Sequence, residues 1–312
     1  MNRIFAIGIS FTIPFFCKSQ LTQDWVMNQL LNYAPSAFTI VNNYQINGPS
    51  IYYGGNSTSN SMRHLKYCEL KDINSFLNSI ATNVHETTHA YDSQLPYLSA
   101  RQGNVPKDLS KTEGFFINTN ENYCVEYGDL QLFPSNKLIY SIPESLQTFR
   151  YKTYITAPPN QSTQNAGVIG LLEEFNAYYH GSKAIFDLLP IFQQEYGANV
   201  LWHWPYNFTS NADAFYEFDF FIKEYLLYAS ENNPQLYASL KANPTFALVY
   251  QKVRASFESL IISYEKKFDE LSKTSTKYGY TTEKHSTIYN TLNVQLKSNR
   301  YLQITRDFLN TN

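Results

Sequence analysis

The chain has 312 residues and a formal net charge of −2, and 43% of its residues are hydrophobic. A chain this close to neutral carries no electrostatic footprint for nucleic acid, which excludes nucleic-acid binding as its main role. The hydrophobic content, which includes 16% aromatic residues, is enough to build a sizeable core in one large domain or two lobes.

The N-terminus has the three parts of a signal peptide. Residues 1–3 are a short positive start, 4–16 are an apolar run too short to span a bilayer comfortably, and 17–19 form a small-x-small pattern. This predicts cleavage after Ser19 and a secreted or periplasmic protein. A lipid anchor on Cys17 is less favoured because a bulky residue precedes the cysteine. No later segment has about 18 consecutive apolar residues, so no membrane span is expected.

The first part of the mature chain is predicted to contain two helices and a small sheet. Apolar residues at helical spacing predict helices over 24–33 and 72–93, and Asp72 is a plausible N-cap for the second. Clusters of β-forming residues predict strands at 37–44 and 50–53, with an Asn-Gly-Pro turn between them.

The next part is rich in Pro, Gly, Asn and β-branched residues, which predicts short strands. We expect these strands at 113–118, 123–127, 137–142 and 150–156.

The rest of the chain is predicted to be mainly helical. The tail, 276–312, is polar and mixed, and its stretch 301–308 is expected to pack back on the body. These patterns predict an α+β fold, in which an N-terminal lobe (20–165) precedes a helical lobe (166–312). The predicted helices of the second lobe cover 166–189, 211–230, 234–241 and 244–273.

Two cysteines remain after removal of the leader. Cys68 and Cys124 lack the paired spacing of a cysteine metal site. In an exported protein they are either joined in one disulfide or present as two free, buried thiols.

The sequence His85-Glu86-Thr87-Thr88-His89 in the helix 72–93 is the strongest functional signal. Histidines four residues apart lie on one face of a helix, where one Zn²⁺ ion can bind both imidazoles. The carboxylate of Glu86 lies at the flank, where it can act as a general base toward a metal-bound water. The alternative is a polar helix face that carries two histidines by chance.

A catalytic zinc site also needs a third protein ligand. A metzincin-like continuation requires glycine and histidine at positions 92 and 95, and neither is present. The best candidate segment is 171–180, in the predicted helix 166–189. At about 100° per residue, Glu173 points nearly opposite the apolar stripe of this helix, whereas Glu174 lies at the edge of the stripe. Glu174 is therefore the favoured ligand, and Glu173 and His180 are alternatives.

The motif at 85–89, followed by Glu-Phe-Asn-Ala-Tyr at 174–178, resembles the gluzincin class of zinc metallopeptidases. The resemblance covers two short motifs. It implies a zincin-like fold, in which a small N-terminal sheet packs on the active-site helix. It also implies that zinc binds to His85, His89 and Glu174 and that Glu86 is the general base and proton shuttle. The interval between the motifs is longer than in the best-known members, which an insertion at 100–165 would explain.

Three further residues are candidates for supporting roles. Zincins usually hold the developing oxyanion with a Tyr or His donor beside the metal. Tyr178 is expected to play this catalytic role or to hydrogen-bond a zinc histidine. His203 is another donor candidate, or a loop histidine packed between two tryptophans. Asp92 is a candidate for orienting a ligand imidazole, or an ordinary residue at a helix C-terminus.

The leading prediction is an exported, zinc-dependent metallopeptidase that acts on peptide or protein substrates. The main alternative is a catalytically silent zincin-like domain that binds a peptide, glycan or protein partner through an aromatic groove. The base Glu86 argues against that alternative, because binding alone does not require it. A zinc hydrolase of non-peptide amides is a third possibility. The sequence does not indicate an oligomeric state.

Overall fold

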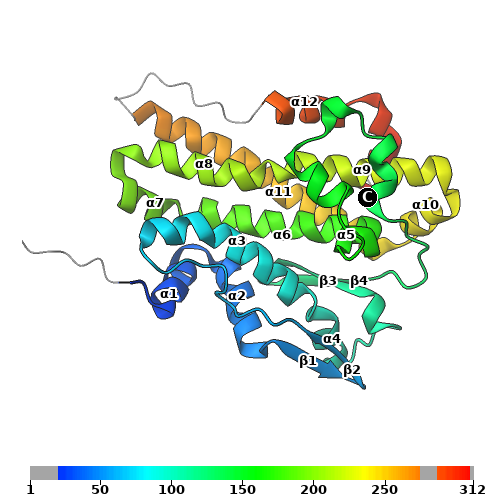
Figure 1. The fold of residues 1–312 in the computed structure, drawn as a ribbon, viewed down its shortest axis with the longest axis horizontal. Helices are drawn as coiled ribbons and strands as arrows, with labels where there is room; N and C mark the ends of the chain where they lie inside the picture. The colour runs from blue at the N-terminus through cyan, green and yellow to red at the C-terminus, as the bar shows by residue number, and fades with distance from the viewer. Residues whose placement is uncertain (1–19, 275–286, 310–312) are drawn as a thin grey trace, which may run out of the picture.

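The computed structural model describes residues 20–274 and 287–309 (Figure 1). The leader predicted at 1–19 therefore lies outside the described residues. The N-terminal part contains α1 (Gln23–Tyr33), α2 (Pro35–Asn47), β1 (Ser50–Tyr53), β2 (Asn56–Ser59), α3 (Ile73–Asp92), α4 (Leu95–Arg101), β3 (Thr112–Asn118), β4 (Glu121–Glu126) and α5 (Ser162–Asn165).

The C-terminal part is built from helices. They are α6 (Gly167–Asp187), α7 (Leu189–Tyr196), α8 (Val200–Ala212), α9 (Ala214–Asn232), α10 (Pro234–Lys241), α11 (Pro244–Thr274), α12 (Thr287–Leu296) and α13 (Leu302–Ile304). Short 3₁₀ turns are η1 (Leu109–Lys111), η2 (Ser135–Tyr140), η3 (Glu144–Leu146), η5 (Gly197–Asn199) and η6 (Asn299–Tyr301), and π turns are η4 (Tyr151–Ile155) and η7 (Thr305–Leu309).

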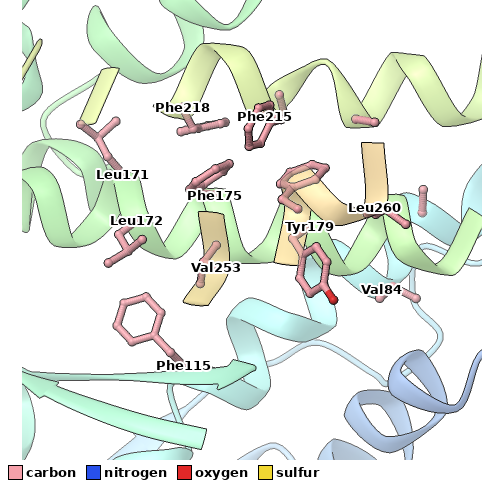
Figure 2. Packing of buried hydrophobic residues seen from close by; sticks show 14 of the residues in the cluster. Val84, Phe115, Leu171, Leu172, Phe175, Tyr179, Phe215, Phe218, Val253 and Leu260 are labelled. Carbon is pink, nitrogen blue, oxygen red and sulfur yellow. The ribbon is translucent and has the colours of Figure 1, made fainter. Parts of the chain in front are cut away.

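Helix α6 runs through the centre of the fold. It contacts α3 on one side and α8, α9 and α11 on others (Figure 1). Figure 2 shows Phe175 of α6 facing Phe215 and Phe218 of α9, with Val253 of α11 nearby. Side chains all around α6 are consequently buried. The prediction of one apolar stripe on this helix is thus wrong, because neighbours cover its other faces as well.

Helix α3 follows its prediction closely. The side chain of Asp72 caps it by accepting a hydrogen bond from the Ser75 N–H at 2.8 Å. Its apolar residues, such as Phe76 and Ile80, are fully buried. The helix packs against α2 and α6, so the H-E-x-x-H motif lies in the interior between two parts of the chain.

Two small antiparallel sheets complete the α+β fold, one formed by β1 and β2 and one by β3 and β4. Strand β3 packs on the C-terminal end of α3. A Cβ atom at Gly114 would lie 2.2 Å from the carbonyl oxygen of Asp92, so this close approach requires glycine. The hairpin of β1 and β2 packs against α4 instead.

Several predicted elements are confirmed. Helices 24–33, 72–93, 166–189, 234–241 and 244–273 and strands 50–53, 113–118 and 123–127 all match structural elements within a few residues. The helix predicted at 211–230 corresponds to α9, although α8 before it was not expected. The predicted lobe boundary falls between α5 and α6.

Three predicted strands are wrong. Residues 37–44 lie in α2, where the buried Ala37, Ile40 and Tyr44 follow helical spacing after a proline at the first turn. Residues 137–142 lie largely in the turn η2, and 150–156 contain the π turn η4. Both short segments have β-forming side chains, but tertiary contacts from α5 and α9 decide their conformation.

The C-terminal stretch packs on the body as expected, and Tyr301, Ile304 and Phe308 are fully buried. Charged side chains of this stretch also interact with side chains of other helices. Arg300 forms an ion pair with Glu224 of α9 at 3.1 Å, and Asp307 accepts a hydrogen bond from Tyr237 of α10 at 2.7 Å.

Both cysteines of the described chain are free thiols, so the disulfide alternative is wrong. Cys68 is buried and Cys124 is partly buried, and burial raises the pKa of each thiol to about 12. Among residues 20–274 and 287–309, no helix has the length and apolarity that crossing a membrane requires.

Candidate metal centre

The packing of α3 against α6 brings His85, His89 and Glu174 together. The two Nε2 atoms of the histidines are 3.0 Å apart. Each of them lies 3.5 Å from Oε2 of Glu174. Three potential ligand atoms thus form a compact triangle between the two helices.

This triangle has the size that a zinc ion requires. Tetrahedral coordination at bond lengths of about 2.0–2.2 Å separates neighbouring ligand atoms by about 3.3 Å. The observed edges of 3.0, 3.5 and 3.5 Å lie on both sides of that value. Histidine nitrogen and carboxylate oxygen are also ligand types that Zn²⁺ accepts.

The hydrogen bonding of Glu174 supports the same fit. Its Oε2 atom is buried and has no hydrogen-bond partner among the described residues. A buried carboxylate oxygen without a partner is unfavourable, and a cation in the triangle would satisfy it. One ion in the triangle would also bind both facing Nε2 atoms, once each imidazole presents an unprotonated nitrogen.

Glu173 is not part of the triangle and contacts the opposite side of the His89 ring. Its carboxylate pairs with Nδ1 of His89, which leaves Nε2 of that histidine to face Glu174. Burial alone would lower the pKa of His89, but the carboxylates of Glu173 and Glu174 hold it well above its ordinary value. A carboxylate on the far nitrogen of a ligand histidine fixes its tautomer and orientation.

His85 has the opposite electrostatic environment. Burial lowers its pKa, and the charges of His89 and Arg150 lower it further, to well below the ordinary value. The imidazole is therefore neutral, which is the form that binds a metal.

Gly181 of α6 lies against this turn of α3, and a Cβ there would lie 2.8 Å from the Ala81 carbonyl oxygen.

Glu86 is half-buried on the flank of the histidine pair. Burial raises the pKa of its carboxyl group; the charge of His89 lowers it, Glu174 raises it and Lys66 lowers it. The side chain is not part of the triangle.

Two tyrosines lie beside the triangle. The hydroxyl of Tyr178 is 3.0 Å from that of Tyr154, and the Tyr178 ring meets the His85 ring edge-on at 4.4 Å. Burial and the nearby Glu174 raise the pKa of Tyr154, so its hydroxyl keeps its proton. Tyr154 was not a candidate in the sequence, because its segment was predicted as a strand.

A buried arginine holds this tyrosine pair in place. The guanidinium carbon of Arg150 lies 4.4 Å from the centre of the Tyr178 ring. Arg150 also pairs with Glu217 of α9 at 2.5 Å and donates to the Ser210 carbonyl oxygen at 2.7 Å. These contacts link the tyrosines to the helices behind the site.

The remaining candidates lie elsewhere. Nε2 of His180 is 2.7 Å from the Phe116 carbonyl oxygen, so this histidine binds β3 rather than the triangle. Asp92 accepts hydrogen bonds from the Phe116 N–H at 2.8 Å and from the Asn176 amide at 2.9 Å, and it orients no ligand imidazole. His203 is helical and stacks on the ring of Tyr196 at 3.7 Å.

Comparisons with known proteins add no relative. No protein-family model, no curated protein and no solved structure matches this chain. The interpretation of the site therefore rests on its own residues and geometry.

Proposed function

We propose that the protein is a zinc-dependent metallopeptidase of the gluzincin class with a zincin-like fold. The observation that carries the proposal is the triangle of His85, His89 and Glu174, in which a buried carboxylate oxygen has no hydrogen-bond partner among the residues that the structure describes. The motif around it places a carboxylate at Glu86, where hydrolysis needs a base. A purely binding domain would not require that base.

Each residue of the centre has a role in this proposal. His85, His89 and Glu174 would hold Zn²⁺, which when bound polarises a carbonyl group and lowers the pKa of a bound water. Glu86 accepts the proton of the attacking water and passes it to the leaving amine. Glu173 keeps His89 in the tautomer that presents Nε2.

The tyrosine pair supplies hydrogen-bond donors. Tyr178 or Tyr154 donates to the oxygen on which negative charge develops during attack on the peptide carbonyl. Arg150, stacked on Tyr178, restrains the ring so that the hydroxyl does not have to reorganise during the reaction. The proposal further includes export, with a leader removed after Ser19. The substrates are peptides or proteins.

Metal analysis of purified mature protein tests the ligand set. We expect about one zinc per chain in the wild type and its loss in Glu174→Ala. Glu231→Ala, which changes an exposed glutamate of α9, is the matched control and should keep its zinc. A well-folded wild type that takes up no zinc, even after reconstitution, would contradict the proposal.

A peptide hydrolysis assay tests whether Glu86 is the general base. Glu86→Gln keeps the size of the side chain and all three ligands, so it should retain zinc while losing about 100-fold or more in kcat. The measurement is cleavage of a mixed peptide library followed by mass spectrometry. Full activity in Glu86→Gln, or zinc binding without any cleavage by the wild type, would rule out the proposed mechanism.

A further inference from the structure

A cavity outside the metal centre opens beside α2. Its volume is about 930 Å³, and it lies between the C-terminal half of α2 and the segment 61–66. Arg63, His64 and Lys66 lie in its wall, together with the uncharged residues Gln23 and Gln45. No acidic residue lines it among the described residues. The cavity, which we call the basic cavity, is therefore positive in a chain whose net charge is −2.

The cations of this wall lack a close carboxylate partner in the described part of the chain. Within the described ranges, neither Arg63 nor Lys66 forms an ion pair with a carboxylate, and Lys66 instead lies 5.1 Å from the ring of Tyr67. The side chains of Arg63 and Lys66 are exposed, and that of His64 is partly buried. Two exposed cations that form no close ion pair can attract an anionic group into the cavity.

The wall of the basic cavity is attached to the turns of α3 that surround Glu86. The side chain of Asn83 accepts from the Tyr67 N–H at 3.1 Å and donates to the His64 carbonyl oxygen at 3.1 Å. Thr87 also faces that carbonyl oxygen, at 3.5 Å. Asn83 and Thr87 lie within one helical turn of Glu86, so the segment 64–67 is held against the part of α3 that carries the base.

We propose that the basic cavity binds a carboxylate of the peptide substrate through Arg63 and Lys66, an inference that rests on the proposed function. A guanidinium group can hold a carboxylate with two parallel hydrogen bonds, and a lysine adds a point charge. An extended peptide advances about 3.3 Å per residue, so the residues next to the cleaved bond can reach the cavity. The carboxylate belongs either to an acidic side chain or to the C-terminus of the substrate.

Calorimetric titration of the full mature chain carrying Glu86→Gln separates these sources. Four unlabelled alanine-rich octapeptides serve as probes, with a central Glu or Gln and with a free or amidated C-terminus. We expect the peptide with the recognised carboxylate to bind about fivefold or more tightly than its neutral counterpart. A preference for Glu over Gln identifies a side chain, and a preference for the free acid over the amide identifies the C-terminus.

Charge-removing variants assign the preference to the basic cavity. Arg63→Gln and Lys66→Gln should each reduce it, and added salt should weaken it. Lys71→Gln removes an exposed lysine that does not line the cavity, so it should leave the preference intact. Equal binding of all four peptides, or a preference that survives both cavity variants, would overturn the inference.

Hydrolysis of the same four peptides by the wild type keeps the two proposals distinguishable. Cleavage without any carboxylate preference leaves the peptidase proposal intact and contradicts the basic cavity. A carboxylate preference that depends on Arg63 and Lys66, in a protein that cleaves none of the peptides, supports the basic cavity and contradicts the peptidase.

Discussion

The orientation of His89 depends on a single neighbour. Glu173 pairs with Nδ1 of this imidazole, while Nε2 faces the ligand triangle. Loss of a carboxylate behind a ligand histidine typically weakens metal binding by about 10–100-fold. Glu173→Gln, which keeps the shape but removes the charge, should therefore weaken zinc binding by this amount, as measured by competition with a chromogenic chelator.

The outcome of this variant also separates two roles of Glu173. A loss of zinc as complete as in Glu174→Ala would identify Glu173 as a ligand in its own right. Unchanged affinity would mean that the contact with His89 is not needed. Glu231→Gln, on the exposed side of α9, controls for the loss of one negative charge.

His180 predicts a pH dependence of stability. Burial lowers its pKa to about 4, against 6.5 for an ordinary histidine. The unfolded chain therefore takes up a proton at a pH where the folded chain does not. Stability from this residue is fully present above pH 6.5 and is lost progressively as the pH falls toward 4. The loss amounts to roughly 3 kcal/mol.

The variant His180→Gln isolates this contribution, because its amide can still donate to the Phe116 carbonyl oxygen and does not titrate. Denaturant unfolding of both proteins at several pH values gives the difference in unfolding free energy. The unfolding free energy of the variant, relative to that of the wild type, should increase as the pH is lowered from 6.5 to 4. A difference that stays constant across that range would contradict the neutral, buried histidine.

At the scale of elements, helices α3 and α6 approach each other so closely at Gly181 that a larger residue does not fit there. A Cβ at Gly181 would lie 2.8 Å from the backbone oxygen of Ala81 and 3.5 Å from Cβ of His85. In an exposed helix, Gly→Ala would stabilise by up to about 1 kcal/mol. Here Gly181→Ala should instead destabilise by about 1–3 kcal/mol, because the two helices must separate.

Thermal and denaturant unfolding of Gly181→Ala, without metal, measure the sign of this effect. Zinc titration of the same variant should also show weaker binding, since His85 moves with α3. A variant that is more stable than the wild type would show that the helices have room at this position.

Elements set by local sequence were predictable, and those set by long-range contacts were not. Helix α3 was predictable because its cap, its apolar spacing and its metal motif are all local in sequence. The conformation of residues 150–156 was not predictable, because Arg150 and Tyr154 are positioned by contacts with Glu217 and Tyr178, far along the chain. Reasoning from the sequence therefore singled out Tyr178 but not its neighbour Tyr154.

The packing of the whole molecule explains why Glu174 lies beside the two histidines, although the sequence argument for choosing it was incomplete. Glu174 was selected on the assumption that α6 has one buried face, and the structure does place it beside the histidines. The central position of α6 buries Glu173 as well, and that carboxylate meets the same histidine from the other side. Only the packing of α3 against α6 assigns a separate position to each acid.

The ligand triangle joins α3 of the N-terminal part to α6 of the C-terminal part, so metal binding should stabilise the molecule as a whole. A ligand that binds only the folded state adds about 2.7 kcal/mol at 100 times its Kd and about 4.1 kcal/mol at 1,000 times. Zinc should thus raise the Tm of the wild type by several degrees, and a strong chelator should reverse the change.

Glu174→Ala shows whether this stabilisation arises at the triangle. Without one ligand, the variant should gain little or no Tm at the same free zinc concentration, while Glu231→Ala should respond like the wild type. Equal stabilisation of Glu174→Ala and the wild type would place the zinc elsewhere in the chain. Because zinc and protons compete for His85 and His89, the Tm gain should also shrink as the pH is lowered.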